Sequence, residues 1–279
     1  MVKKDISAAE HVLLARKPGR PTSIEYIEKI FDDYFPLAGD RLSAEDESIT
    51  GGVAFFHGRP VTVIAQRKGR NLEENVALRF GMPNPQGYRK AVRLMKQAEK
   101  FKRPVITFVD TPGAYPGLEA EMNGQGEAIA RSIMTLTDLK VPVISVFIGE
   151  GGSGGALAMG VSDRCLMLEN SIFSILSPEG FASILWKDSS RWKEAAEVMK
   201  LTAQDLFELG ICDHVIEEGD ISDSRTKVFW EIDRGISEAL KELSRTSTEN
   251  LVKERYKKLR RVGASVNATG KAGKDAERN

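Results

Sequence analysis

Two stretches of the chain repeat the same order of features: a continuous apolar run, a glycine-containing loop and a helix pattern. Residues 103–110 lead into the loop 111–117, and residues 141–148 lead into the loop 149–155. A continuous apolar run is typical of a strand covered on both faces, and strands that alternate with helices indicate a parallel sheet. The sequence therefore predicts an α/β fold in which both loops follow neighbouring parallel strands and face one cleft.

The other elements are predicted from hydrophobic periodicity and turn residues. Helix patterns cover residues 8–16, 23–35, 86–101, 119–136, 156–161, 226–243 and 249–261, and a further helix begins at Pro178. Strand patterns cover residues 51–56, 60–67, 165–168, 172–176 and 214–216, and the first two form a hairpin. We divide the chain into an N-terminal helical segment (1–45), a core (46–220), a C-terminal helical arm (221–262) and a tail predicted to be disordered (263–279).

The composition argues against several classes of function. Forty basic residues balance forty acidic ones, so the net charge of zero gives no reason to expect nucleic acid or an anionic membrane as a partner. The basic residues after Val252, Arg255 among them, are expected to be solvated. Cys165 and Cys212 lie far apart and the three histidines are scattered, so neither a disulfide nor a metal site is expected. No apolar run approaches the roughly 18 residues of a membrane-spanning helix and no secretory signal is present, which favours the cytoplasm.

The loop 149–155 matches a dinucleotide-binding motif. Gly149, Gly151 and Gly154 fit the G-x-G-x-x-G fingerprint, and Glu169 is the acidic residue expected roughly twenty positions further on. Such a fingerprint normally belongs to the first β-α-β unit of its domain, whereas here a similar unit precedes it. A dehydrogenase is therefore the weaker interpretation.

The same loop also fits G-x-S-x-G, which would make Ser153 a nucleophile. His214 is the only histidine downstream, with Asp188 and Asp205 as candidate third members, but the residues around His214 are typical of an ordinary strand. A third interpretation uses the glycine backbones, because amides at a helix N-terminus can stabilise an oxyanion without a side-chain nucleophile.

Seven segments, taken in order, carry a family resemblance. They are Gly51-Gly52, Gln66-Arg67-Lys68-Gly69, Phe80-Gly81-Met82, Gly87-Tyr88-Arg89-Lys90-Ala91, Asp110-Thr111-Pro112-Gly113-Ala114-Tyr115-Pro116-Gly117, Gly149-Glu150-Gly151-Gly152-Ser153-Gly154-Gly155-Ala156 and Ser177-Pro178-Glu179-Gly180. Together they closely resemble the carboxyltransferase alpha subunit of bacterial acetyl-coenzyme A carboxylase. The resemblance implies a crotonase-like fold (ClpP/crotonase), a superhelix of repeated ββα units with helical N- and C-terminal arms.

The resemblance also implies a reaction, the transfer of a carboxyl group from carboxybiotin to acetyl-CoA, which makes malonyl-CoA for fatty acid biosynthesis. The backbone amides of Gly154 and Gly155 would form the oxyanion hole for biotin. Further contacts to biotin are expected from Gly151, Gly152, Gly113, Ala114, Tyr115 and Pro116. Arg67 and Lys68 either contribute positive charge near CoA phosphates or form a solvated strand end. Two alternatives stay open: a carboxyltransferase for another acyl-CoA, and a serine hydrolase that uses Ser153.

The partners that the resemblance implies are separate proteins. The chain would act only with a beta subunit that carries a zinc ribbon, in an α2β2 heterotetramer, and would itself hold no metal. Biotin would arrive on the biotin carboxyl carrier protein after an ATP-dependent biotin carboxylase has carboxylated it. The chain departs from the family pattern at Met122-Asn123 and at Gly219-Asp220-Ile221-Ser222, and most of the N-terminal extension is missing, as in short family members.

Overall fold

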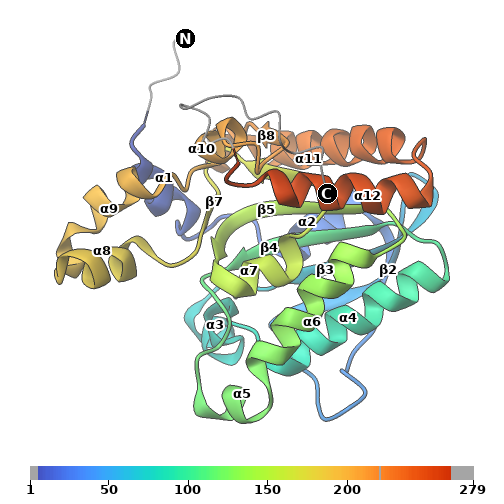
Figure 1. Cartoon of the computed structure of the whole chain (residues 1–279), viewed down its shortest axis with the longest axis horizontal. Helices are drawn as coiled ribbons and strands as arrows, with labels where there is room; N and C mark the ends of the chain where they lie inside the picture. Colours follow the sequence, from blue (N-terminus) through green and yellow to red (C-terminus); the bar gives the residue numbers. More distant parts are fainter. Residues whose placement is uncertain (1–5, 220, 265–279) are drawn as a thin grey trace.

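The computed structural model describes residues 6–219 and 221–264, with side chains for all of these except 221–226. A sheet runs through the centre of the described part of the chain (Figure 1). Its strands are β1 (Asp32–Pro36), β2 (Ile49–Phe56), β3 (Arg59–Gln66), β4 (Val105–Thr111), β5 (Val143–Gly152), β6 (Arg164–Leu168), β7 (Ile172–Ser174) and β8 (His214–Ile216). The strand order is β1-β2-β3-β4-β5-β6-β8, and β7 pairs with the end of β5.

The directions of the strands confirm the predicted parallel sheet. β3, β4, β5, β6 and β8 are parallel, whereas β1, β2 and β3 form antiparallel pairs. β2 and β3 are the predicted hairpin, and their turn contains His57 in a left-handed conformation (φ +47°). Phe108 on β4 and Phe147 on β5 are completely buried, as expected for strands covered on both faces.

Helices cover both faces of the sheet. They are α1 (Ala8–Ala15), α2 (Ser23–Ile30), α3 (Leu72–Ala77), α4 (Pro85–Lys100), α5 (Leu118–Met122), α6 (Gln125–Asp138), α7 (Ser153–Gly160), α8 (Pro178–Trp186), α9 (Trp192–Met199), α10 (Ala203–Glu208), α11 (Ile221–Leu243) and α12 (Thr248–Arg261). Residues of α2 and α11 form the core on one face, and residues of α4, α6, α7 and α10 form the core on the other. α8 and α9 extend to one side of this body, next to α1 (Figure 1).

The helix predicted at residues 23–35 is wrong beyond Ile30. α2 ends there, Phe31 is extended (φ −119°, ψ 145°), and β1 follows as an edge strand paired with β2. In the sequence, the apolar side chain of Phe31 continues the helical spacing. In the structure it is buried against the rings of Phe56 and Phe108, which belong to the sheet. The segment 1–45, predicted as helical, therefore contains one strand, and the division into domains stays a prediction.

The single helix predicted at residues 119–136 is two helices in the structure. α5 and α6 are separated by Asn123 and Gly124, and Gly124 has φ +82°. A glycine in this left-handed conformation is a common way for a helix to end. Here the Gly124 amide donates to the carbonyl of Glu121.

The C-terminal helices pack on the core, and α12 brings a buried arginine with it. The Arg255 Nε and Nη2 atoms bond the Asp163 carboxylate at 2.8 and 2.7 Å. Its Nη1 atom donates to the carbonyls of Leu136 and Leu139 at 2.7 Å each. The expectation that Arg255 is solvated is therefore wrong, because an amphipathic charge pattern does not reveal an ion pair formed across the fold. Residues 265–279 of the predicted tail lie outside the described residues.

Candidate active site

The loop after β4 lies against the end of β5 and the first turn of α7. The prediction of a loop at 149–155 is wrong, because β5 continues to Gly152 and α7 begins at Ser153; we keep the name glycine loop for residues 149–155, which span this junction. A Cβ atom on Gly152 would lie 2.0 Å from the carbonyl oxygen of Pro112, and one on Gly155 would lie 2.6 Å from the nitrogen of Ala114. Neither distance leaves room for a side chain, so glycine at these two positions is what allows the loops to approach. The structure thus brings together the two loops that the sequence singled out.

The first turn of α7 presents free backbone amides. The helix begins at Ser153, which has φ +53°, three residues earlier than predicted. Gly154 is half-buried and Gly155 is buried, and amides in a first turn have no acceptor within the helix. Neither amide donates a hydrogen bond to another residue that the structure describes. A helix N-terminus with free amides favours negative charge, so this turn can hold an oxyanion.

The opposite loop is held in place by a side chain that the sequence analysis did not select. The Gln125 Nε2 atom donates to the carbonyls of Pro83 and Tyr115 at 2.8 and 2.9 Å, and the Tyr115 amide donates to the Pro83 carbonyl at 3.0 Å. The Arg79 guanidinium lies over the Tyr115 ring, 5.7 Å from its centroid. Tyr115 is half-buried, whereas the following Pro116 is exposed.

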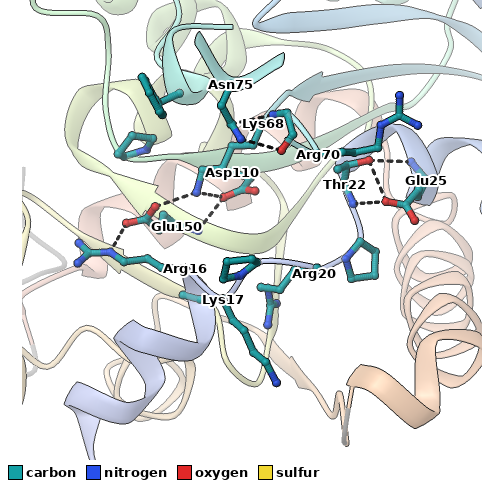
Figure 2. A pocket seen from close by; sticks show the side chains of 17 residues that line it. Arg16, Lys17, Arg20, Thr22, Glu25, Lys68, Arg70, Asn75, Asp110 and Glu150 are labelled. Atoms are coloured by element: carbon teal, nitrogen blue, oxygen red, sulfur yellow. Dashed lines mark hydrogen bonds and ion pairs between the residues drawn. The ribbon is translucent and has the colours of Figure 1, made fainter. Parts of the chain in front are cut away.

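A group of charged side chains supports the start of the loop 149–155 (Figure 2). The Lys68 Nζ atom lies 2.8 Å from Asp110 Oδ1 and 2.8 Å from Glu150 Oε2. Asp110 Oδ1 also accepts the Glu150 amide at 2.9 Å. A Cβ atom on Gly149 would lie 2.5 Å from the same oxygen, so the carboxylate occupies the space that a side chain would need. We name Lys68, Asp110 and Glu150 the carboxylate-lysine cluster.

The ion pair between Lys68 and Glu150 favours the charged form of both side chains. Burial alone would lower the pKa of Lys68, but the carboxylates of Asp110 and Glu150 outweigh burial and raise it. Burial alone would raise the pKa of Glu150, but Lys68 and Arg16 outweigh burial and lower it. The positive charge of Lys68, which the sequence associated with CoA phosphates or with solvent, therefore lies between two carboxylates.

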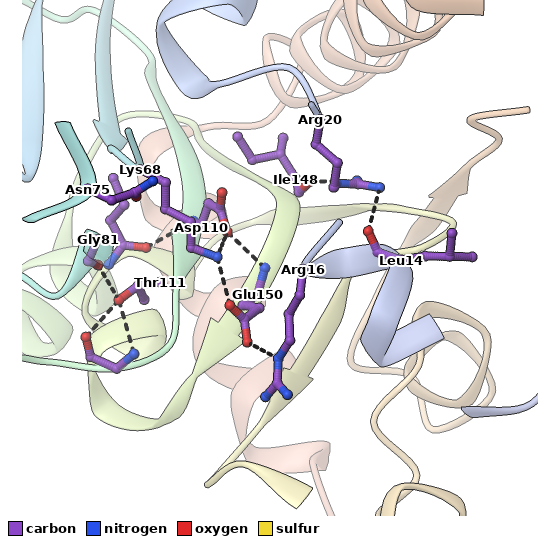
Figure 3. A network of polar contacts seen from close by, with 12 residues as sticks. Leu14, Arg16, Arg20, Lys68, Asn75, Gly81, Asp110, Thr111, Ile148 and Glu150 are labelled. Carbon is purple, nitrogen blue, oxygen red and sulfur yellow. Dashed lines mark hydrogen bonds and ion pairs between the residues drawn. The ribbon is translucent and has the colours of Figure 1, made fainter. Parts of the chain in front are cut away.

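Arg16, at the end of α1, contacts both this cluster and a helix that is distant in the sequence. Figure 3 shows its contact with Glu150. Its Nε atom lies 2.7 Å from Glu150 Oε1, and its Nη1 atom lies 2.7 Å from Glu179 Oε1 on α8. Arg16 and the cluster line a pocket of about 510 Å³ (Figure 2). The N-terminal segment, the end of β5 and α8 are therefore joined by one set of ion pairs.

Thr111, at the end of β4, also holds the loop that follows it. Its hydroxyl lies 2.7 Å from the carbonyl oxygens of Gly81 and Gly113, and it accepts the Gly113 amide at 3.1 Å (Figure 3). Thr111 and Gln125 are functional supports that sequence reasoning missed. In the sequence, the only indication of a role for either residue is its place beside a glycine motif.

The two competing interpretations of the glycine loop find no support in the geometry. The Ser153 hydroxyl bonds no other residue in the described part of the chain, and His214 lies on β8, which β6 separates from β5. Glu169 accepts the Glu218 amide at 3.3 Å.

In the described residues no group of three or more His, Cys, Asp or Glu side chains could hold a metal ion. Cys165 and Cys212 are buried free thiols, and within the same ranges no helix could cross a membrane.

The chain is similar to known proteins in both sequence and structure. The family model described as acetyl co-enzyme A carboxylase carboxyltransferase-like matches residues 1–263. The chain is 57% identical over 265 residues to the acetyl-coenzyme A carboxylase carboxyl transferase subunit alpha of Clostridium acetobutylicum, covering 94% of this chain and 97% of the relative. It is 56% identical over 265 residues to the corresponding beta/alpha protein of Natranaerobius thermophilus, covering 94% of this chain and 44% of that longer relative.

Among solved structures, the chain is similar to the transcarboxylase 12S bound to methylmalonyl-coenzyme A. The TM-score is 0.69 at 20% identity, and the match covers 83% of this chain and 43% of that one. The fold is therefore crotonase-like. The family model and the relatives define the class of protein, a carboxyltransferase subunit. The chain belongs to the family of acetyl-CoA carboxylase carboxyltransferase alpha subunits.

Proposed function

We propose that this chain, with a beta subunit, transfers the carboxyl group of carboxybiotin to acetyl-CoA and so forms malonyl-CoA for fatty acid biosynthesis. The observation that carries the proposal is the pair of free amides at Gly154 and Gly155, the second of which is held against the loop at Gly113 and Ala114. A site of this kind supplies charge stabilisation and needs no nucleophilic side chain.

The amides of Gly154 and Gly155 act as hydrogen-bond donors to an oxygen that becomes negative. Carboxybiotin supplies the carboxyl group, and the ureido oxygen gains negative charge as that group leaves. Donors fixed by the protein before the reaction stabilise such charge without reorganisation, and loss of one typically costs about 10²–10³ in rate. The half-buried helix terminus suits this role, because exclusion of water strengthens each hydrogen bond.

The remaining contacts to biotin come from both loops. Gly151 and Gly152 form the backbone next to the donors, and the opposite wall is built by Gly113, Ala114, Tyr115 and Pro116. Gln125 holds the Tyr115 carbonyl and Arg79 lies over the Tyr115 ring, so the ring has a fixed place in the opposite loop.

The other components act as separate proteins. A beta subunit would bind the acyl-CoA and complete an α2β2 heterotetramer, and the fused beta/alpha relative supports a close functional association. The biotin carboxyl carrier protein would deliver biotin, and a biotin carboxylase would use ATP to load it. We place the assembly in the cytoplasm.

The reverse reaction tests the proposal and its substrate. This chain, combined with the beta subunit of the Clostridium acetobutylicum relative, is incubated with free biotin and either malonyl-CoA or methylmalonyl-CoA, and the CoA product is measured. We expect biotin-dependent formation of acetyl-CoA at a higher kcat/KM than formation of propionyl-CoA. A preference for methylmalonyl-CoA would replace acetyl-CoA by a larger acyl-CoA, and turnover without biotin would contradict the carboxyltransferase assignment.

A further inference from the structure

Gln66, the last residue of β3, joins the two segments that form the candidate active site. Its side chain is completely buried. The Nε2 atom donates to the Gly155 carbonyl at 2.8 Å, and the Oε1 atom accepts the Asp110 amide at 3.2 Å. A buried carboxamide is costly unless its polar atoms are paired, and here both partners are backbone groups of the site.

Gly155 needs such support more than other residues would. Glycine has the widest range of backbone conformations, yet the direction of the Gly155 amide decides whether it can serve an oxyanion. On one side the loop at Gly113 and Ala114 limits the position of its Cα atom. The hydrogen bond from Gln66 fixes the Gly155 carbonyl, which shares a peptide plane with the Ala156 amide. The Gly155 amide belongs to the preceding plane, so Gln66 acts on it through the Gly155 backbone dihedrals, which the contact with the opposite loop also limits.

We infer that Gln66 is a positioning residue for the oxyanion hole: it does not touch the substrate, but it sets the orientation of Gly155 through the Gly155 carbonyl. This inference rests on the proposed function. The carboxylate-lysine cluster holds the start of the loop at Gly149 and Glu150, whereas Gln66 holds the end that carries the catalytic amides. Gln66 is the last residue of β3, and Lys68 of the cluster follows it by two residues.

Two variants test whether Gln66 positions Gly155 or only fills space in the core. Gln66→Met keeps the length of the side chain and removes both hydrogen bonds. Gln66→Glu keeps the shape and removes the donor to Gly155 while the introduced carboxyl is ionised. Burial raises the pKa of a carboxyl group, and the protonated form regains an O–H donor, so the lost hydrogen bond can return as the pH falls.

Thr107→Val is the matched control. The Thr107 hydroxyl is buried and donates to the Met159 carbonyl at 2.7 Å, near the opposite end of α7. The control therefore removes a buried hydrogen bond to the same helix without touching the loop. All chains are assayed with the beta subunit in the biotin-dependent conversion of malonyl-CoA, and urea midpoints are measured in parallel.

We expect Gln66→Met to lower kcat by about 10- to 100-fold at every pH, with little change in the KM for malonyl-CoA. For Gln66→Glu, the kcat ratio to wild type should rise as the pH falls. The neighbouring charged groups are Lys68, Asp110 and Glu150, and they interact with the introduced carboxyl, so the pH at which the ratio rises is a property of the whole group. Thr107→Val should lose stability and keep kcat.

Three results would overturn the inference. In the first, Gln66→Met loses no more kcat than Thr107→Val. In the second, the ratio for Gln66→Glu does not change with pH. In the third, the wild-type pair is inactive, and this result overturns the proposed function as well, whereas the first two leave that function intact.

Discussion

At the scale of single residues, Gly154 and Gly155 differ in what a methyl group would meet. A Cβ atom on Gly154 would lie 3.4 Å from Ile129 Cγ2, an ordinary contact, whereas one on Gly155 would lie 2.6 Å from the Ala114 nitrogen. We therefore expect Gly155→Ala to displace the loop, with a loss in kcat of about 10²-fold or more. Its urea midpoint should fall as well.

Gly154→Ala is the comparison for this prediction. Alanine is preferred over glycine within a helix by up to about 1 kcal/mol, so its urea midpoint should stay equal to or exceed that of wild type. Equal midpoints and equal kcat values for Gly155→Ala and wild type would show that the close approach of the two loops is not required.

Ser153 is a second residue whose role can be tested alone. It opens α7 in a left-handed conformation, and its hydroxyl bonds no other described residue. Loss of a true serine nucleophile costs about 10⁶-fold in kcat, whereas we expect Ser153→Ala to retain most of its activity with the beta subunit. A folded but inactive variant, together with labelling of wild type by a fluorophosphonate, would support the hydrolase interpretation.

Whether the sequence predicts a site residue depends on how far along the chain its interaction partners lie. The glycines at 113, 149, 151, 152, 154 and 155 are visible because a motif groups them. Gln66, Thr111 and Gln125 act through hydrogen bonds to backbone groups that are remote in the chain. A single sequence does not display such pairs, so these supports become apparent only in the fold.

At the scale of elements, the carboxylate-lysine cluster joins the segment after β3 to β4 and β5 by ion pairs, and the pair between Lys68 and Glu150 responds to pH. The pKa of Glu150 is lowered in the folded chain from a usual value of 4.5. Glu150 therefore stabilises the fold above that value, and this contribution disappears as the pH falls through the lowered pKa. We expect Glu150→Gln to reduce the free energy of unfolding near neutral pH.

The decisive measurement is the difference in unfolding free energy between wild type and Glu150→Gln as a function of pH. The difference should be largest near about pH 7 and should shrink on acidification to about pH 3. A difference that stays constant over this range would mean that the ionisation of Glu150 does not contribute to stability.

The docking of α12 gives a prediction for the C-terminal helices. Arg255 is buried and paired with Asp163, and removal of one partner from a buried ion pair typically costs about 3–5 kcal/mol. We expect this loss in unfolding free energy for Arg255→Met in urea titrations. Lys257→Met, an exposed change on the same helix, should alter stability by less than about 0.5 kcal/mol; equal losses would contradict the structural role of Arg255.

The sequence predicts a helix or strand correctly where its local hydrophobic pattern matches its place in the fold. The buried strands β4 and β5 and the hairpin of β2 and β3 follow from apolar runs and a turn. β1 was missed because its pairing with β2 is not local. The break between α5 and α6 was missed because a glycine in a helical pattern can be tolerated, as Gly126 is within α6. Both errors concern the edge of the sheet or the end of a helix, where tertiary contacts decide.

At the scale of the whole molecule, the fold brings two glycine loops together, and we propose one oxyanion site there, built from backbone amides. The two anionic oxygens of the proposed reaction, one on biotin and one on the thioester, need two such sites. This chain would supply the first and the beta subunit the second, so each subunit alone should be inactive. The size of the chain fits this role, since 279 residues suffice for one crotonase-like body with helical arms.

The measurement that tests this account most directly compares three samples: this chain alone, the beta subunit alone, and both together. Each is supplied with biotin and malonyl-CoA, and the release of acetyl-CoA is followed. We predict turnover in the mixed sample and none above background in the other two. Biotin-dependent turnover by this chain alone, or none in a mixture shown to contain the assembled complex, would contradict the account.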